Sequence, residues 1–367
     1  MSTDTHPGPW RGWTDQRIVV VGAGITGLLA AVRGVLLGHR VIVLERGPIP
    51  NPAASSFDQH RAVRALDPAD LEATRRAVAA HRRWLELESL LCGPGPGGGF
   101  YRRVGVVTAW PEERIDEVAA AGAEAGLRVE PVAAARLRPM GFPAGSAGLL
   151  ELDAGVLLAD RVLAAATAWL ARHPMAELRP WQEVVAVDPD DARVVLADGS
   201  AERGDLVLVG AGPWTPKLVD VPIIVHRQTM LYLRPPEELA GWWKTAPSAG
   251  GVGADGRGWL MPPVQGTLLK ISTDAACREV PAADAPDDDE ARWTKEILDA
   301  EIVTDVERYE VAGVKRCHYA VDAVTGAGRL VRVGPSVWAR AASGGDGFRT
   351  APLVADQIAG ALLGVAA

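Results

Sequence analysis

Residues 17–47, RIVVVGAGITGLLAAVRGVLLGHRVIVLERG, decide the fold. The stretch opens with a continuous apolar run at 18–21, which is typical of a strand buried on both faces. A helical run follows at about 25–37, and a second apolar strand follows at 41–44. This order predicts a strand–helix–strand unit of about 30 residues and an α/β fold built on a parallel sheet.

Three glycines join the first predicted strand to the helix. Gly22, Gly24 and Gly27 form G-x-G-x-x-G, and Glu45 ends the second strand 21 residues after Gly24. The same pattern at 251–256 follows no predicted strand and opens no predicted helix, so the first copy alone has the context of a dinucleotide site. The glycines let the backbone approach a pyrophosphate, and Glu45 is expected to accept hydrogen bonds from ribose hydroxyls. The motif serves FAD and NAD alike, and the residues alone leave that choice open.

Composition narrows the class of protein. The chain has 367 residues, a length that suggests about two domains, and 48% of them are apolar. Its net charge of −8 argues against general binding to nucleic acid or acidic membranes. Cys92, Cys277 and Cys317 lack the spacing of a disulfide framework or a metal site. With no signal-peptide pattern and no apolar run of membrane-spanning length, we expect a soluble cytoplasmic protein that begins with a flexible tail at 1–16.

Segments spread along the chain resemble a known family. The first glycine motif, DLVLVGAGPW (205–214) and GGDGFRTAPLVADQIAGAL (344–362) together resemble the D-amino-acid-oxidase-like flavoprotein superfamily. SSFDQHRAVR (55–64), WLMPPVQGTLLK (259–270) and KRCHYAVD (315–322) resemble its sarcosine oxidase branch, which includes N-methyl amino acid and pipecolate oxidases. The resemblance implies that the dinucleotide is FAD.

The resemblance also implies an architecture. An α/β fold is expected, with a Rossmann-like FAD-binding domain and a mixed β-sheet substrate domain. We expect the FAD-binding domain to be assembled from 17–80, 150–220 and 321–367, and the substrate domain from 81–149 and 221–320. These boundaries are approximate.

A set of FAD contacts follows from the same likeness. They are Gly22, Gly24, Ile25, Thr26, Gly27, Glu45, Arg46, Arg61, Val184, Cys317, Gly345, Asp346, Gly347, Phe348 and Arg349. The glycine-rich turn GGDGFRT is expected to present backbone N–H groups to the flavin O2 edge. The absence of a second nicotinamide-type fingerprint favours reoxidation by O2 or another acceptor over NAD(P).

Cys317 has two readings. In the resembled branch this cysteine is joined to the flavin 8α-methyl group as a thioether, which implies covalent FAD here. Lys315 and Arg316 would lower the pKa of the thiol if they point the same way. The alternative is a buried, inert thiol that only packs.

The resemblance assigns roles on the substrate side as well. Arg64 and Arg349 match the positions at which the branch clamps a substrate carboxylate, where a guanidinium binds in a bidentate way. Lys270 matches the lysine that activates oxygen, since a positive charge near flavin N5 stabilises superoxide as it forms. A solvated strand-end lysine and ordinary surface arginines are the plain alternatives.

Other positions line the predicted substrate pocket or depart from the branch. Tyr319 and Trp259 stand where the branch places pocket aromatics. Asp274 and Asp346 replace histidines, which puts sarcosine itself in doubt. Asp274 either favours a substrate with an additional cationic group or binds Lys270.

The predicted function is an FAD-dependent oxidase of a secondary amine, imino acid or small amino acid. Hydride transfer to flavin N5 gives an imine, and O2 reoxidises the flavin to give H2O2. One alternative is a dehydrogenase of the same fold that passes electrons to a carrier, and another is a flavin-binding protein without turnover. The sequence names neither the substrate nor the oligomeric state, because small pocket changes redirect a fold easily.

Overall fold

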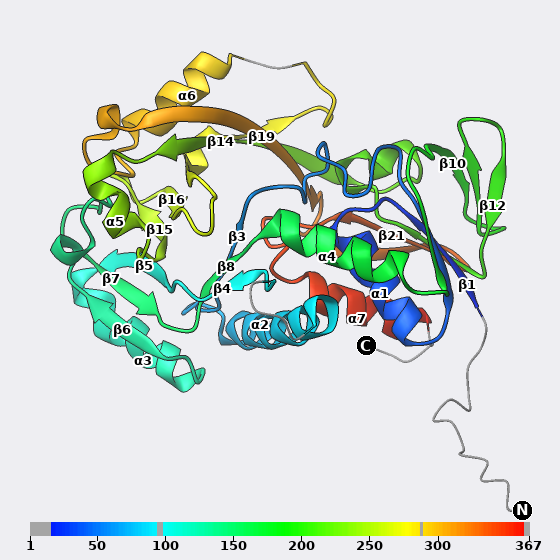
Figure 1. Cartoon of the computed structure of the whole chain (residues 1–367), viewed down its shortest axis with the longest axis horizontal. Helices are drawn as coiled ribbons and strands as arrows, with labels where there is room; N and C mark the ends of the chain where they lie inside the picture. Colours follow the sequence, from blue (N-terminus) through cyan, green and yellow to red (C-terminus); the bar gives the residue numbers. More distant parts are fainter. Residues whose placement is uncertain (1–15, 94–97, 287–288, 363–367) are drawn as a thin grey trace, which may run out of the picture.

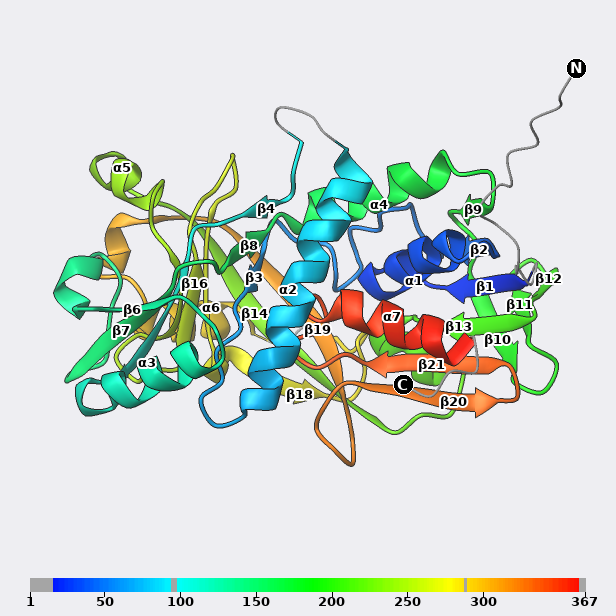
Figure 2. The same ribbon diagram turned by 90° about the horizontal axis from the view of Figure 1, so that it is seen from below.

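The computed structural model describes residues 16–93, 98–286 and 289–362. The predicted flexible tail, apart from Gln16, lies outside the described residues. The molecule is elongated, with one large sheet in each half, and the views in Figures 1 and 2 show the two halves side by side along the long axis. The predicted α/β class is therefore confirmed.

The first sheet is built on the predicted strand–helix–strand unit. In the described residues it has six strands, in the order β20 (Arg329–Gly334), β21 (Val337–Ala342), β13 (Leu206–Val209), β1 (Arg17–Val21), β2 (Arg40–Leu44) and β9 (Ala176–Arg179). All neighbours are parallel except β20 and β21. Such strands are apolar throughout because both faces of the sheet are covered.

Helices cover one face of this sheet and a small sheet covers the other. Figure 2 shows the four helices gathered on one side: α1 (Ile25–Leu36), α2 (Leu71–Cys92), α4 (Ala159–Ala171) and α7 (Ala351–Leu362). Their apolar side chains form one core with the sheet, in which Leu28 and Trp84 are fully buried. The opposite face packs against β10 (Val184–Asp188), β11 (Arg193–Leu196) and β12 (Ala201–Arg203).

The second half holds a nine-stranded mixed sheet. Its order in the described residues is β18 (Cys277–Val280), β14 (Ile223–Arg234), β17 (Leu269–Thr273), β16 (Gly258–Met261), β15 (Ser248–Val252), β5 (Val106–Pro111), β7 (Ser146–Glu151) and β6 (Val129–Val132), with β19 (Glu310–Asp322) paired to β14. The helices of this half are α3 (Ile115–Glu124), α5 (Ala240–Trp243) and α6 (Glu290–Asp299). The long β14–β19 pair runs from this half toward the first one (Figure 1).

A second small sheet lies between the halves in Figure 1 and joins β3 (Arg61–Val63), β8 (Gly155–Leu157) and β4 (Tyr101–Arg102). The strand β3 follows directly on the loop that leaves β2, so the chain carries residues 45–60 from the first sheet toward the second. No helix among the described residues is both long and apolar enough to cross a membrane.

Several strands were not predicted, and β19 and β21 are two of them. The strand β19 has a mixed polar and apolar sequence and is mostly only partly buried, and β21 is rich in alanine, so neither shows clear alternation or a β-branched run. The division into two domains stays a prediction. Three of its boundaries, 80/81, 149/150 and 320/321, fall inside α2, β7 and β19.

Candidate functional site

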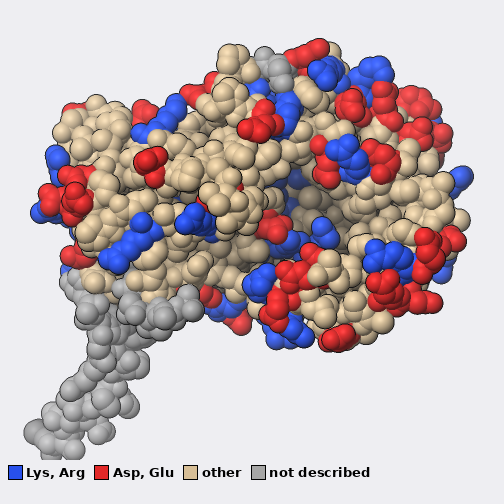
Figure 3. Space-filling view, turned by 180° about the vertical axis from the view of Figure 1, so that it is seen from behind, with Lys and Arg blue, Asp and Glu red and all other residues tan. Residues whose placement is uncertain are grey.

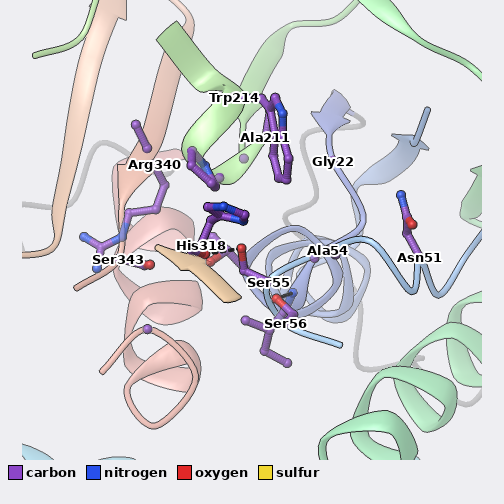
Figure 4. A pocket seen from close by; sticks show the side chains of 18 of the residues that line it. Gly22, Asn51, Ala54, Ser55, Ser56, Ala211, Trp214, His318, Arg340 and Ser343 are labelled. Carbon is purple, nitrogen blue, oxygen red and sulfur yellow. Dashed lines mark hydrogen bonds between the residues drawn. The ribbon is translucent and has the colours of Figure 1, made fainter. Parts of the chain in front are cut away.

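One long pocket runs past the carboxyl ends of β1 and β2 toward β19 (Figure 4). The predicted FAD contacts that line it are Gly22, Gly24, Ile25, Thr26, Glu45, Arg46, Arg61, Val184, Cys317, Gly345, Gly347 and Phe348. Tyr319, predicted on the substrate side, also lines it. The glycine-rich strand–helix turn therefore lies in one cavity with Cys317, although about 290 residues separate them in the chain.

The glycines of the turn serve two different needs. Gly22 has a φ of +99°, and a Cβ there would lie 2.6 Å from the Gly210 carbonyl oxygen. A Cβ on Gly27 would lie 2.0 Å from the oxygen of Gly22, so Gly27 allows close packing within the turn and does not line the pocket. Gly24 lines the pocket, with Ser56 Oγ 3.2 Å from the position of a Cβ. Its missing side chain keeps the approach to the α1 N-terminus open.

Glu45 is held in place at the end of β2. Its carboxylate is buried and accepts hydrogen bonds from Ala23 N (2.8 Å), Asn51 Nδ2 (2.9 Å) and Gly47 N (3.2 Å). These donors fix a negative group beside the turn, where it also lines the pocket. The position suits the predicted contact with ribose hydroxyls.

The loop between β2 and β3 ties the two ends of the pocket together. Ser56 Oγ accepts a hydrogen bond from Ile25 N (2.9 Å) at the start of α1, and Ser55 Oγ donates to the His318 carbonyl oxygen of β19. Figure 4 shows Ser55 and Ser56 between the α1 turn and His318. The two serines were not predicted, although they open the quoted segment SSFDQHRAVR.

Cys317 is a buried thiol on the pocket wall. Arg61 Nη2 lies 3.8 Å from its sulfur and also donates to the Ser55 carbonyl oxygen at 2.6 Å. Lys315 donates instead to the Phe57 carbonyl oxygen, and Arg316 pairs with Glu290 at 3.4 Å. The cation beside the thiol is therefore Arg61 and not either neighbour in the sequence.

A buried carboxylate that was not predicted stands next to this thiol. Asp58 accepts hydrogen bonds from Tyr232 Oη (2.6 Å) and Lys270 Nζ (3.0 Å), and Arg61 Nη1 lies 3.3 Å from it. Burial alone would raise the pKa of Asp58, but the charges of Lys270 and Arg61 hold it well below its usual range. Lys315 adds a third positive charge nearby.

Lys270 is the second residue of β17 and is fully buried, so it is not a solvated lysine. Besides Asp58, its ammonium donates to the His60 carbonyl oxygen at 2.6 Å and lies 5.8 Å from the centre of the Trp259 ring. Burial lowers the pKa of Lys270 to about 8, and Asp58 opposes a further fall. Its acidic partner is Asp58, while Asp274 is exposed.

The two arginines predicted to clamp a carboxylate lie together. Arg349 Nη1 donates to the Arg64 carbonyl oxygen at 3.3 Å, and Arg349 Nη2 pairs with the exposed Asp346 at 2.6 Å. Arg349 Nε is buried and has no hydrogen-bond partner among the described residues. Burial raises the pKa of nearby Glu151, and the positive charges of Arg64 and Arg349 reduce that rise. Its oxygens accept from backbone N–H groups of 65 and 66 and so leave the guanidinium groups free of it.

Tyr319 lies on the same strand as Cys317 and stacks on His226, with ring centres 5.2 Å apart. Its hydroxyl lies 3.2 Å from Cys277 Sγ, and burial raises the pKa of both groups.

A hollow with Lys, Arg, Asp and Glu at its rim opens on the face shown in Figure 3.

The remaining predicted residues lie outside the pocket lining. They are Gly27, Arg64, Trp259, Lys270, Asp274, Asp346 and Arg349. Lys270 contacts Trp259 and belongs, with Arg61, to the buried charge cluster around Asp58. Arg64 and Arg349 lie near Glu151. Lining residues that sequence reasoning missed include Asn51, Ser55, Ser56, Trp214, His318, Arg340 and Ser343 (Figure 4).

Comparison with known proteins agrees with this geometry. A family profile described as "DAO: FAD dependent oxidoreductase" matches residues 17–361. The chain belongs to this DAO family. The predicted superfamily and the predicted class, an FAD-dependent oxidoreductase, are therefore confirmed.

Individual relatives of this DAO-family protein are distant. It is 25% identical to "Peroxisomal sarcosine oxidase" of Mus musculus over 231 residues, 59% of this chain and 56% of the relative. It thus spans little more than half the length of the curated relative it matches. The solved open form of NikD, "an unusual amino acid oxidase essential for nikkomycin biosynthesis", has a TM-score of 0.75 at 19% identity and 94% and 93% coverage of this and that chain. The fructosamine oxidase Amadoriase II of Aspergillus fumigatus has a TM-score of 0.76 at 17% identity, with 97% and 88% coverage. These two likenesses show the fold.

The residues of this DAO-family protein fit FAD. The helix N-terminus and Gly24 leave room for a pyrophosphate, Glu45 is fixed where a ribose is expected, and the cavity continues to a buried thiol. The donor set is thus suited to a dinucleotide at one end and to a reactive ring at the other.

Proposed function

We propose that the protein is an FAD-dependent oxidase of a secondary amine, an imino acid or a small amino acid. The observation that carries the proposal is one pocket with a glycine-rich turn at one end and a buried cation cluster, through Arg61, at the other. FAD, when bound, accepts a hydride equivalent from the carbon beside the substrate nitrogen and passes two electrons to O2, which gives an imine and H2O2.

Backbone groups and one carboxylate would hold the dinucleotide. The α1 N-terminus and Gly24 would receive the pyrophosphate, because the N–H groups of a first helical turn and the helix dipole favour anions. Glu45 would accept hydrogen bonds from a ribose. The turn at 343–348 would present backbone N–H groups to the ring.

Cys317 would carry the cofactor covalently. Its Sγ would bond to the flavin 8α carbon, that carbon would lose one proton, and the two electrons left on the ring would pass to O2. The thiolate is the reactive form of a cysteine, and Arg61 Nη2 lies 3.8 Å from the sulfur of Cys317. Burial of the sulfur on the pocket wall is what supports this role.

Arg64 and Arg349 would bind a substrate carboxylate. The buried and unpartnered Nε of Arg349 is a donor that such an anion satisfies, because a buried N–H without an acceptor costs free energy. Glu151 balances part of the positive charge without occupying the guanidinium groups. A bidentate contact of this kind fixes orientation as well as charge.

The names of the relatives support the substrate class. One curated relative is named sarcosine oxidase, and the solved structures that share the fold are titled amino acid and fructosyl amine oxidases. Asp274 and Asp346 stand where the resembled branch carries histidines, so sarcosine itself is not the expected substrate.

An anaerobic screen tests the proposal. N-methyl, cyclic and plain amino acids are mixed with the yellow protein without oxygen, and bleaching of the flavin absorbance identifies substrates. Air is then admitted, and recovery of absorbance within the turnover time, with one H2O2 per imine, is expected. Bleaching without recovery in air would identify a dehydrogenase that uses another acceptor, and no bleaching by any amine would refute the proposed substrate class.

A further inference from the structure

Asp58 is the buried acid that connects the candidate catalytic cations. Its side chain is fully buried and contacts Lys270, Arg61 and Tyr232 at 2.6–3.3 Å. The three groups come from β17, β3 and β14, and Tyr232 is also the register partner of Lys270 across the β14–β17 pair. A carboxylate bonded from three elements is rigid, because each donor restricts it in a different direction.

We propose that Asp58 is a positioning residue for oxygen chemistry, which holds the ammonium of Lys270 in place and keeps it charged. The proposal rests on the proposed oxidase function. In that reaction O2 takes two electrons from the reduced cofactor and two protons to become H2O2, and the first electron makes superoxide. A fixed positive charge nearby lowers the cost of that first step.

The surroundings of Lys270 show why a carboxylate is needed. An ammonium with no exposed surface has lost its hydration, and a buried lysine without a partner releases its proton. The titratable and charged groups that face the cluster are Asp58, His60 and Arg61 on the loop and β3, Tyr232 on β14, and Lys315 and Cys317 on β19. Burial lowers the pKa of His60 to about 3, so His60 is neutral and adds no charge.

The balance of charge favours an anion beside the cluster. Three cations, Lys270, Arg61 and Lys315, face the one carboxylate of Asp58. Asp58 therefore neutralises enough charge to let the cations stay buried, while a positive excess is left for superoxide. Its removal would leave like charges together in a low-dielectric site, and the group that can lose a proton is Lys270.

The test is the pH dependence of reoxidation in Asp58→Asn. The flavin of the wild type and the variant is reduced without oxygen and mixed with O2 in stopped flow at pH 6–10. In the wild type the rate should fall as pH rises through about 8, because Lys270 loses its proton. In Asp58→Asn the same fall should move to lower pH by about two to three units, so that the rate at pH 7.5 drops tenfold or more.

Controls separate positioning from general damage. Asp153→Asn makes the same chemical change at an exposed acid and should leave the profile as in the wild type. Asp58→Glu keeps the negative charge, so the pH at which the rate falls should return most of the way to the wild-type value. A profile in Asp58→Asn that superimposes on the wild type overturns the proposal alone, with oxidase function intact. Reoxidation that is slow and independent of pH in the wild type overturns the oxidase function and, with it, this role.

Thermal unfolding gives a readout that needs no turnover. Without Asp58, the pKa of Lys270 in the folded protein should be lower than in the wild type. The unfolded state then binds more protons than the folded state, so the stability of the variant rises with pH. The Tm deficit of Asp58→Asn should therefore be larger at pH 6 than at pH 9. Asp58→Asn/Lys270→Met should be more stable than Asp58→Asn at pH 6. If the single variant does not accumulate, the double variant should still do so. A double variant no more stable than the single one overturns the proposal.

Discussion

The two ends of the pocket are built from different kinds of groups. At the α1 end, backbone N–H groups and one acid, Glu45, face the cavity, and the contacts come from a stretch of about 30 residues. At the Cys317 end, side chains of Arg61, Lys270 and Asp58 pack in a buried cluster that draws on three separate elements. The first end has the groups that the proposed binding of FAD requires, and the second has the charged side chains that the proposed reaction with O2 requires.

This difference implies that binding and reactivity can be lost separately. Backbone groups hold a ligand by shape and dipoles, which side-chain charges elsewhere hardly change. A charge cluster in a water-excluded site acts on the energy of a reaction step, because electrostatic effects are larger there. Changes at the α1 end should therefore remove the cofactor, while changes at the Cys317 end should leave yellow protein with altered kinetics.

The largest effect is expected at the binding end. Gly24→Val adds a branched side chain where Gly24 lines the pocket and Ser56 Oγ is already 3.2 Å from a Cβ position. The variant should purify without flavin absorbance, because the pyrophosphate can no longer approach α1. Gly241→Val is the matched control, since nothing lies within 4 Å of its Cβ position. Fully loaded, yellow Gly24→Val protein would contradict the assignment of this end.

Lys270→Met should give the next largest effect, and on the other end. The change keeps much of the side-chain volume but removes the charge beside the pocket. Reoxidation by O2 should slow by about 10²–10³, the usual loss for a positioned electrostatic group. Flavin content should stay at the wild-type level, and reduction by substrate should change much less. Timing the two half-reactions separately by stopped flow checks this, and unchanged reoxidation would place oxygen chemistry at another group.

The two ends also differ in how far the sequence predicts them. The turn of β1–α1 could be read directly, because each glycine answers a local requirement within a few residues of chain, as the contact between Gly22 and Gly27 shows. The family resemblance then placed Arg61 and Cys317 on the same pocket. Both residues line the pocket, and the contact between them at 3.8 Å was not predicted.

The cluster around Asp58 could not be predicted in the same way. Asp58 lies 212 residues from Lys270 and 174 from Tyr232, so no spacing in the chain connects the carboxylate with its donors. Asp274, only four residues from Lys270, was the nearer candidate, but it is exposed. Strand register decides the matter: β14 brings Tyr232 opposite Lys270, and register follows from tertiary packing. The strand β19 was also missed because its pairing with β14 depends on tertiary packing, and its partly polar sequence shows no alternation.

Arg349→Ala and Arg64→Ala should each weaken substrate binding by about 1.5–3 kcal/mol, the range for a hydrogen bond to a charged group. That loss corresponds to a roughly 10- to 150-fold rise in the Kd measured by anaerobic flavin spectra. The esterified substrate should lose a similar factor against the wild type. Arg203→Ala removes an exposed arginine that pairs with Asp191 and should leave the Kd unchanged. Equal reaction of acid and ester would show that the pocket does not read a carboxylate.

Cys317→Ser should have the smallest effect on turnover and the clearest effect on linkage. The wild type should stay yellow after acid precipitation, and its intact mass should include FAD. In the serine variant the glycine-rich end and Glu45 are untouched, so FAD should still bind in the native protein but leave on precipitation. Cys92→Ser is the matched control, because Cys92 lies at the end of α2 away from the pocket lining. If acid releases all flavin from the wild type, Cys317 is a packing residue, and the nearby guanidinium of Arg61 serves the charge cluster and not the thiol.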